Sequence, residues 1–452
     1  MMEIPCGMQE QFLEAKQLIE SSNDIKIYTH TDCDGICSGA ILSIILDRLN
    51  KDYEIEFVNL DEIEDLDLDH KLTIFSDLGS GQGVDKNAKD GQKILILDHH
   101  PPLRDINYKN DKAYTYLEIN PMFYGIDGSY YVCGGGLCYF LAKTFGFKDL
   151  SWIGVLSAIG DMQNNKTGHF EGLNEIIQED AINEGLLKVT KNDLNIYGRS
   201  TRPLYVALSY FSDVKLPITN NQQEAKVVLE ELGVDEKHNR KTLSEVTEED
   251  KMEIKKFLSR MISKRVPPKY LKYVPKLIVG DAYTFLNEEE GSFLRDGSEF
   301  STAMNACGRN RKEAIGVDII KGDRLVALDA LEEVSKTHKY NLATSISKVA
   351  DNYHSEIIEL DNFQYFDCSD FDEDIASNII GTITGMVLGY CNWKKPILGF
   401  SKPKNNQIKV SLRCSKLLAY DGIHFGNMMR EIAKEVGAVS YTHLRAHETR
   451  SN

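Results

Sequence analysis

Short apolar runs alternate with longer segments of helical periodicity through the N-terminal part of the chain. Three runs, at residues 25–28, 72–75 and 93–97, are mostly apolar and predict buried strands. Residues 38–49 carry apolar side chains at helical spacing, and the YEIEFVNL segment that follows alternates like an edge strand. Strands separated by helices are typical of a parallel sheet wrapped by helices. The sequence therefore predicts an α/β fold with a doubly wound, largely parallel sheet.

The pattern changes after residue 165. Residues 166–300 are charge-rich and helical, as in EVTEEDKMEIKKFLSRMISKR, and predict a mainly helical insertion. Residues 301–374 return to a mixed pattern and predict a connecting α/β region. In residues 375–439, IIGTITGMVLGY precedes KPILGFSK and QIKVSLRC, which predicts a helix and two strands. We therefore expect a first domain over residues 1–165 and a second, smaller α/β domain at the end.

The composition is that of a folded protein. Of the 452 residues, 42% are hydrophobic and 27% charged, which excludes disordered and collagen-like chains. No run reaches the roughly 18 apolar residues that a membrane helix needs, and no basic flank precedes an apolar core at the N-terminus. The nine cysteines are odd in number and contain no CxxC pair, which indicates reduced thiols and argues against a zinc ribbon. We expect a cytoplasmic protein.

One late segment is basic inside an acidic chain. The formal net charge is −17, which taken whole disfavours binding of nucleic acid by bulk attraction. Residues 375–420, however, contain no Asp or Glu and seven Lys or Arg, so this segment carries +7 and the rest carries −24. The charge distribution therefore indicates a local surface for a polyanion.

Residues of the types that bind metal ions follow each predicted strand. The carboxyl ends of strands in an open parallel sheet share one edge, and ligands bind at that edge. A fourth apolar run, SWIGVLSAIGDM, also ends in Gly-Asp. The candidate residues that these segments supply are His30, Asp32, Asp34, Asp77, Asp98, His99, His100 and Asp161.

These residue types favour divalent-cation chemistry. Carboxylate oxygens with one or two imidazoles suit manganese or magnesium, whereas zinc more often recruits thiolates. Several carboxylates close together repel one another unless cations neutralise them, and two cations about 3.5 to 4 Å apart can clamp a phosphoryl group. A single Asp after a strand is most often a helix cap or turn residue, but four such endings in one α/β pattern favour a joint site. The residues predict phosphoester hydrolysis.

The triplet Asp98-His99-His100 and the segments around it resemble the DHH phosphoesterase superfamily, whose four motifs occur in order over residues 24–165. The resemblance implies two manganese ions, with magnesium as an alternative, and a phosphate-binding role for His100. It implies that Asp98 supports the two histidines. His30 is also a candidate, although several members place this histidine where the chain has Tyr28. The ligands implied by the resemblance are Asp32, Asp34, Asp77, His99 and Asp161.

The resemblance extends to the archaeal RecJ-like nucleases of the superfamily. YGRSTRPLYVALSY (197–210), FSTAMNACGR (300–309) and VSLRCS within the basic segment carry it. It implies a manganese-dependent exonuclease acting on single-stranded DNA or RNA, for which the GINS complex of the replication fork is an expected partner. It also implies that residues 1–165 are the DHH catalytic domain and that residues 375–439 are a nucleic-acid-binding, DHH-associated domain.

Several arginines and glycines are further candidates for anion binding. Arg309, Arg413 and Arg202 are the candidate substrate-binding residues, since a guanidinium can hold a phosphate with two hydrogen bonds. Surface or interdomain ion pairs explain Arg202 and its neighbour Arg199 equally well. Residues 134–136 are three glycines that either open an anion-binding helix N-terminus or allow close helix packing.

The C-terminal sequence departs from the family pattern. After GIHFGNMMREIAKEVGAV the family has a Gly-Gly-Gly-His signature that helps to bind substrate, and this signature is absent here. Residues 440–452 resemble a translated sequencing-adapter read-through. We therefore expect the natural sequence to stop near Val439, with a truncated second domain followed by an artefactual tail.

Two other functions are compatible with the sequence. A relative that hydrolyses short oligonucleotides, cyclic dinucleotides or pyrophosphate would use the same ligands, although the large insertion and the basic segment favour a polymer. A replication-scaffold protein associated with GINS is the alternative from another class, because eukaryotic relatives of these nucleases have lost ligands and serve as helicase subunits. Intact candidate ligands at all four motifs favour the enzyme.

Overall fold

The computed structural model describes residues 2–60, 62–109, 113–234, 241–350, 356–371, 373–401, 408–423 and 425–436. The expected tail at 440–452 lies outside the described residues. The chain forms two compact units, and each is described by itself. The first unit comprises Met1–Lys188, Thr284–Asn287 and Phe300–Val334, and the second comprises Val189–Tyr283, Glu288–Glu299 and Ser335–Asn452. None of the helices in the described ranges is long and apolar enough to cross a membrane.

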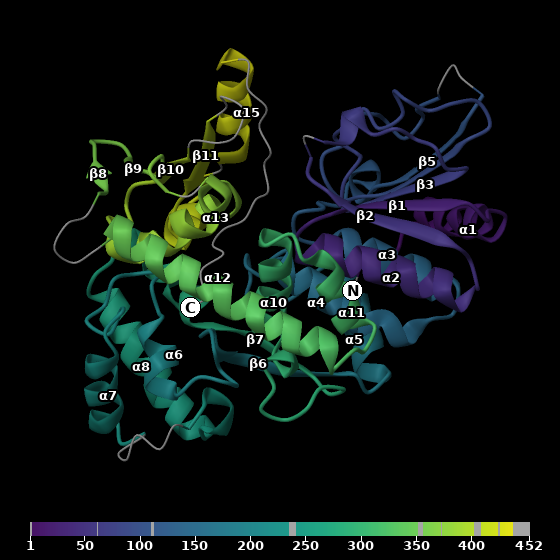
Figure 1. Ribbon diagram of the computed structural model, residues 1–452. Helices are drawn as coiled ribbons and strands as arrows, with labels where there is room; N and C mark the ends of the chain where they lie inside the picture. The colour runs from purple at the N-terminus through teal and green to yellow at the C-terminus, as the bar shows by residue number, and fades with distance from the viewer. Residues whose placement is uncertain are drawn as a thin grey trace. The chain divides into compact units, whose positions relative to one another are not determined.

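A five-stranded, fully parallel sheet forms the centre of the first unit (Figure 1). Its order is β2-β1-β3-β4-β5, which is a strand order of doubly wound folds, and it confirms the predicted α/β fold with a parallel sheet. Because β1 lies between β2 and β3, the chain direction through the sheet reverses between β1 and β3. In such sheets ligands bind beyond the carboxyl ends of the strands at this switch point. The strands are β1 (Ile25–His30), β2 (Tyr53–Val58), β3 (Leu72–Ser76), β4 (Lys93–Leu97) and β5 (Thr115–Ile119).

Helices pack on one face of this sheet, and the connecting segments cover the other. Helices α2 and α3 contact the central strands, α1 contacts β5, and α4 packs on α2 and α3. On the opposite face, the strand residues Tyr28, Phe75 and Ile96 pack against Leu68 and Val84 from the connections between strands. The helices of the first unit before residue 188 are α1 (Cys6–Glu20), α2 (Cys33–Arg48), α3 (Gly134–Thr144), α4 (Ser151–Gly160) and α5 (Leu173–Asn183).

Two expectations for local structure need correction. The helix expected over residues 38–49 begins earlier, at Cys33, because the Asp32 carboxylate accepts an N–H from Gly35 and caps its N-terminus. The fourth apolar run is a helix, α4, whereas the three runs before it are strands. All ten of its residues are buried, so its sequence lacks the polar face that marks a surface helix.

The second unit contains helices from the segment predicted as a helical insertion and a small four-stranded sheet. The sheet has the order β11-β10-β9-β8, and α13 packs on β10 and β11. The two predicted late strands are β10 and β11, which pair antiparallel. The elements that lie in this unit are α6 (Leu204–Ser209), α7 (Gln222–Glu231), α8 (Glu248–Ser263), α9 (Val274–Ile278), β8 (Ile358–Glu359), β9 (Gln364–Asp367), α13 (Glu373–Met386), β10 (Ile397–Ser401), β11 (Lys409–Arg413), α14 (Lys416–Tyr420) and α15 (Phe425–Val436).

Five further elements complete the fold. Strands β6 and β7 form a two-stranded sheet. Helix α11 packs on α2 of the first unit, which ties residues after 300 to the N-terminal sheet domain. These elements are β6 (Leu187–Leu194), β7 (Val279–Phe285), α10 (Gly297–Arg309), α11 (Glu313–Ile320) and α12 (Val326–Ala350).

Candidate metal centre

Acidic side chains surround the switch point between β1 and β3. His30 is the last residue of β1, Asp32 caps α2, and Asp34 lies in the first turn of that helix. Asp77 follows β3 directly and has φ +57°, a left-handed conformation that Asp tolerates better than most residues. His30 Nδ1 lies 3.2 Å from Asp32 Oδ1 and 3.5 Å from Asp77 Oδ2. The first two predicted motifs therefore meet at this edge.

The residues after β4 form a compact hydrogen-bonded turn. Asp98 Oδ1 accepts the backbone N–H groups of His99 and His100 at 2.7 and 3.2 Å, and it contacts His100 Nδ1 at 2.7 Å. Asp98 Oδ2 accepts the N–H of Ser80 at 2.9 Å. His99 Nδ1 lies 2.7 Å from the carbonyl oxygen of Gly128. Asp98 thus fixes both histidines, and the carbonyl fixes the ring of His99.

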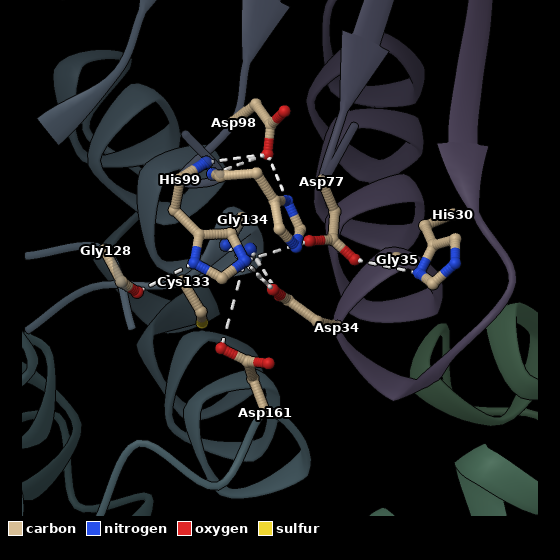
Figure 2. A network of polar contacts seen from close by, with 12 residues as sticks. His30, Asp34, Gly35, Asp77, Asp98, His99, Gly128, Cys133, Gly134 and Asp161 are labelled. Atoms are coloured by element: carbon tan, nitrogen blue, oxygen red, sulfur yellow. Dashed lines mark hydrogen bonds and ion pairs between the residues drawn. The ribbon is translucent and has the colours of Figure 1, made fainter. Parts of the chain in front are cut away.

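The four predicted motifs converge on His99 Nε2. This nitrogen lies 3.5 Å from Asp34 Oδ2, 3.2 Å from Asp77 Oδ1 and 3.8 Å from Asp161 Oδ2. Figure 2 shows the three carboxylates pointing toward this ring from separate segments. Asp161 occupies its place as the residue directly after α4. The structure therefore brings together all the candidate metal-binding residues of the first unit.

The glycine run at the start of α3 binds an anion, and that anion is a side chain. The N–H groups of Gly134 and Gly135 donate to Asp34 Oδ2 and Oδ1 at 2.8 and 2.7 Å, and Ser157 Oγ also hydrogen-bonds to Oδ1. Close packing also requires these glycines, because a Cβ on Gly134 would lie 2.7 Å from Asp77 Cβ. The sequence left these two roles as alternatives, and both hold.

A late helix supports the first motif. Asn305 Oδ1 on α10 accepts the backbone N–H of Cys33 at 3.0 Å. A Cβ on Gly308 would lie 1.7 Å from the carbonyl oxygen of Thr31, so only glycine allows this approach of the helix. Arg309 follows directly and is the last residue of α10. The FSTAMNACGR stretch therefore reaches the loop after β1 through Asn305 and Gly308, two residues that no sequence pattern marks as part of the site.

Comparison with known proteins identifies the family. Residues 24–155 match the family described as "DHH family, N-terminal domain", and residues 196–274 match the DHH-CID domain. An uncharacterised protein of Methanocaldococcus jannaschii, MJ0831, is 30% identical over 421 residues, which cover 91% of this chain and 86% of the relative. The chain belongs to the DHH family.

Solved structures share the fold of this DHH chain at low sequence identity. CDC45 from Entamoeba histolytica has a TM-score of 0.63 and 16% identity, with 95% of this chain and 93% of that protein covered. RecJ from Thermus thermophilus, solved in complex with Mn²⁺, has a TM-score of 0.50 and 11% identity, with 92% and 48% covered. The shared architecture is therefore that of RecJ and CDC45.

Burial and mutual charge shift the pKa values of the acidic and histidine side chains in the DHH site. Burial and then the Asp34 charge raise the pKa of Asp77 well above its usual value. Burial also raises the pKa of Asp161. Burial works against the charged form of His99, but Asp161 and the other carboxylates raise the pKa of its imidazole well above its usual value. Burial likewise disfavours ionisation of Asp98, yet His100 and the surrounding N–H donors lower the pKa of that carboxyl.

The donor atoms fit divalent cations. Asp77 Oδ2 and His99 Nε2 are buried, and neither has a hydrogen-bond partner in the described part of the chain. Because His99 Nδ1 donates to the Gly128 carbonyl, a neutral ring directs the Nε2 lone pair at the carboxylates, which is the orientation of a metal ligand. Carboxylate oxygens and one imidazole match the ligand preference of manganese or magnesium. The cluster can therefore hold metal, which would relieve the repulsion among its anions.

The other predicted arginines belong to the second unit. Arg413 is the last residue of β11, and its Nη1 lies 3.5 Å from the Leu412 carbonyl oxygen. Arg199 is buried and pairs with Asp193 at 2.5 Å and Asp296 at 3.8 Å, so ion pairing explains it. Arg202 is partly buried and donates its backbone N–H to the Gly198 carbonyl oxygen.

Proposed function

We propose that this DHH chain is a manganese-dependent phosphodiesterase that hydrolyses single-stranded DNA or RNA from an end, in the manner of a RecJ-like exonuclease. The observation that carries the proposal is the convergence of Asp34, Asp77 and Asp161 on His99 Nε2 at the switch point of the sheet. The Mn²⁺ in the similarly folded RecJ of Thermus thermophilus supports manganese as the cofactor.

The carboxylates of the cluster and the His99 imidazole would bind the metal ions. Asp32, Asp34, Asp77, His99 and Asp161 would hold two manganese ions, with magnesium as an alternative. When bound, these ions supply the Lewis acidity that phosphodiester hydrolysis requires. The cluster is largely buried, which strengthens every electrostatic contact within it.

Two histidines beside this cluster would assist it, one by binding the substrate and one by holding the carboxylates. His100 would orient the scissile phosphate and neutralise its charge. Its ring is held for this task by the 2.7 Å contact between Nδ1 and Asp98 Oδ1. His30 would steady the carboxylates of Asp32 and Asp77, which its Nδ1 approaches from the end of β1.

The basic positions support a polymeric substrate. Arg309 follows the glycine that packs against Thr31, so it is close in sequence to a contact with the metal-binding loop. Arg202 and Arg413 would bind further phosphates, and Arg413 belongs to the late segment that carries a local +7. Repeated phosphate contacts favour a nucleic-acid strand over a single phosphate ester. We place this activity in the cytoplasm and in DNA repair or replication.

A scaffold role is the second candidate. The likeness to CDC45, which extends over 93% of that protein, favours it. In this role the chain would associate with GINS, alone or alongside catalysis. Retention of GINS subunits by the full chain and by a catalytically inactive variant would support the scaffold role, whereas absence of retention would remove it.

End-labelled substrates test the proposal. The full chain is incubated with single-stranded DNA or RNA and Mn²⁺, beside Asp77→Ala and the exposed control Asp52→Ala. We expect mononucleotides from the unchanged chain and the control, and none from Asp77→Ala or in the presence of chelator. Release of phosphate from pyrophosphate, or cleavage of dinucleotides alone, would instead establish the short-substrate enzyme. No hydrolysis of any of these substrates would contradict the proposal.

A further inference from the structure

A buried glutamine joins two of the proposed ligands. Gln163 is 2% exposed, and its side-chain Nε2 donates to Asp161 Oδ2 and to the carbonyl oxygen of Gly128, both at 2.8 Å. The same carbonyl accepts from His99 Nδ1 at 2.7 Å. One amide group therefore fixes the Asp161 carboxylate directly and the His99 ring through a shared acceptor.

The orientation of this amide follows from its surroundings. A carboxylate and a carbonyl only accept hydrogen bonds, so the NH₂ end of Gln163 must face Asp161 and Gly128. Its Oε1 then faces the other way and accepts from Asn174 Nδ2 at 2.8 Å. Asn174 also donates to the Tyr130 carbonyl oxygen at 3.4 Å, which directs its own NH₂ toward these acceptors. Asn174 thus dictates which end of Gln163 meets the ligands.

The local backbone is built around this arrangement. Only glycine fits at position 128, because a Cβ there would lie 2.0 Å from the His99 carbonyl oxygen. Glycine therefore allows the close approach in which the Gly128 carbonyl reaches the His99 ring. Gln163 is held at the end of α4, where its N–H donates to the Ala158 carbonyl. Asn174 lies in the first turn of α5, and its N–H donates to the Tyr131 carbonyl. Three separate segments therefore fix the donor and acceptors of one relay.

We propose that Gln163 and Asn174 are positioning residues that hold Asp161 and His99 in the geometry for metal binding; this inference rests on the proposed metal-dependent function. Their role in this proposal is to hold the ligands and not to bind substrate. Asn174 acts only through Gln163, so a change at Asn174 tests the relay without altering a side chain next to a proposed ligand.

Two isosteric substitutions break the relay in different places. Asn174→Asp replaces the donor to Gln163 by an acceptor, so the Gln163 amide must turn and present its oxygen to Asp161 and Gly128. Gln163→Glu places a carboxylate against the same two acceptors. Asn174→Asp suits folding, because an acidic residue in the first turn of α5 interacts favourably with the helix N-terminus. Gln178→Glu is the matched control, a buried glutamine one turn further along α5.

Mn²⁺ affinity of the full chain, measured by calorimetry, provides the test. We expect Asn174→Asp and Gln163→Glu to bind Mn²⁺ about 10- to 100-fold more weakly, as for other outer partners of metal ligands, while Gln178→Glu binds as the unchanged chain does. Thermal unfolding in chelator identifies variants that fold. Unchanged Mn²⁺ affinity in either folded relay variant, or an equal loss of affinity in Gln178→Glu, overturns this inference and leaves the proposed function in place. If the unchanged chain binds no Mn²⁺, both the metal centre of the proposed function and the positioning role of Gln163 and Asn174 are contradicted.

Discussion

The backbone N–H of Gly134 donates to Asp34 Oδ2 over 2.8 Å, across 100 residues of sequence. Asp34 belongs to the first turn of α2, and Gly134 begins α3. Two helix N-termini therefore face one carboxylate, and each favours negative charge there. The backbone N–H groups of Gly134 and Gly135 thus hold Asp34 toward the proposed metal centre without adding a full positive charge that would compete with a bound cation.

Substitution of Gly135 tests how tightly this contact is built. In Gly135→Ala the new Cβ would lie 2.2 Å from Ser157 Oγ, so α3 and α4 must move apart. We expect a loss of about 1–3 kcal/mol in the free energy of unfolding, the usual cost of overpacking a core. Urea denaturation measures it. Gly81→Ala is the control, because Gly81 is exposed and its nearest contact would be 3.5 Å away. Equal stability of the two variants would contradict the close packing of α3 against α4.

Manganese should stabilise the fold itself. Because cations relieve the repulsion among buried carboxylates, Mn²⁺ at about 100 times its Kd should add about 2.7 kcal/mol to the free energy of unfolding. Thermal unfolding with and without Mn²⁺ measures the effect. Asp77→Asn should abolish the increase, and Asp52→Asn, at an exposed position, should retain it. A manganese effect that survives Asp77→Asn would place the ion elsewhere.

Gly308 should matter for metal binding although it is far from the ligands in sequence. In Gly308→Ala the Cβ would lie 1.7 Å from the Thr31 carbonyl oxygen, which must displace the loop that carries Asp32. We expect Mn²⁺ affinity to fall by tenfold or more, roughly as for other supporting residues. Calorimetric titration compares it with Lys312→Ala, an exposed substitution shortly after α10. Equal affinities would show that the loop does not depend on this helix.

Arg309 should contribute to substrate binding more than to the chemical step. A charge-assisted hydrogen bond to phosphate is worth about 1.5–3 kcal/mol, so Arg309→Gln should raise KM about 10- to 100-fold with a smaller change in kcat. Steady-state kinetics on a single-stranded oligonucleotide measures both. Arg311→Gln, at an exposed neighbouring position, should leave KM unchanged. A loss confined to kcat would contradict a binding role for Arg309.

The second unit should lose stability as pH rises toward neutrality. Burial and then the Asp296 charge raise the pKa of Glu299 from 4.5 to about 7. The fold therefore favours the protonated carboxyl, and the free energy of unfolding should fall between about pH 4.5 and 7 and level off above. Glu299→Gln removes this dependence, so at pH 8 we expect it to be about 1–3 kcal/mol more stable than the unchanged chain.

Denaturation at pH 5 and pH 8 measures the Glu299 effect. Glu299→Gln keeps an oxygen that can accept from the Ser200 N–H, which the glutamate accepts at 3.1 Å. The exposed substitution Glu332→Gln is the control and should follow the pH dependence of the unchanged chain. A stability difference between Glu299→Gln and the unchanged chain that is the same at both pH values would exclude Glu299 as its source.

Strong local patterns predicted the sheet and its acidic edge. The runs that became β1, β3 and β4 are apolar because helices or connecting segments cover both faces of those strands, and this burial is readable from sequence. Their carboxyl ends then follow from the parallel topology. The sequence of α4 does not identify it as a helix, because burial on every side removes the periodicity that distinguishes a helix from a strand.

The supporting contacts of the site could not be read in the same way. Asn305 Oδ1 accepts the Cys33 N–H at 3.0 Å although 272 positions separate the two residues. No periodicity in the sequence marks such a pairing. Gln163 lies beside a predicted ligand but gains its role only through Asn174 and Gly128, which arrive from other segments. Pairings of this kind depend on tertiary packing, and a single sequence carries no signal for them.

The contact between Asn305 and Cys33 also orders events during synthesis. The ribosome makes the acidic loop after β1 long before it makes α10, and the partner of the Cys33 N–H emerges 272 residues later. A nascent chain that has completed the parallel sheet therefore still lacks the helix that packs on this loop. The geometry of the proposed metal site becomes complete only after about two thirds of the chain has been translated, so a prematurely terminated product would carry the acidic residues without their final support.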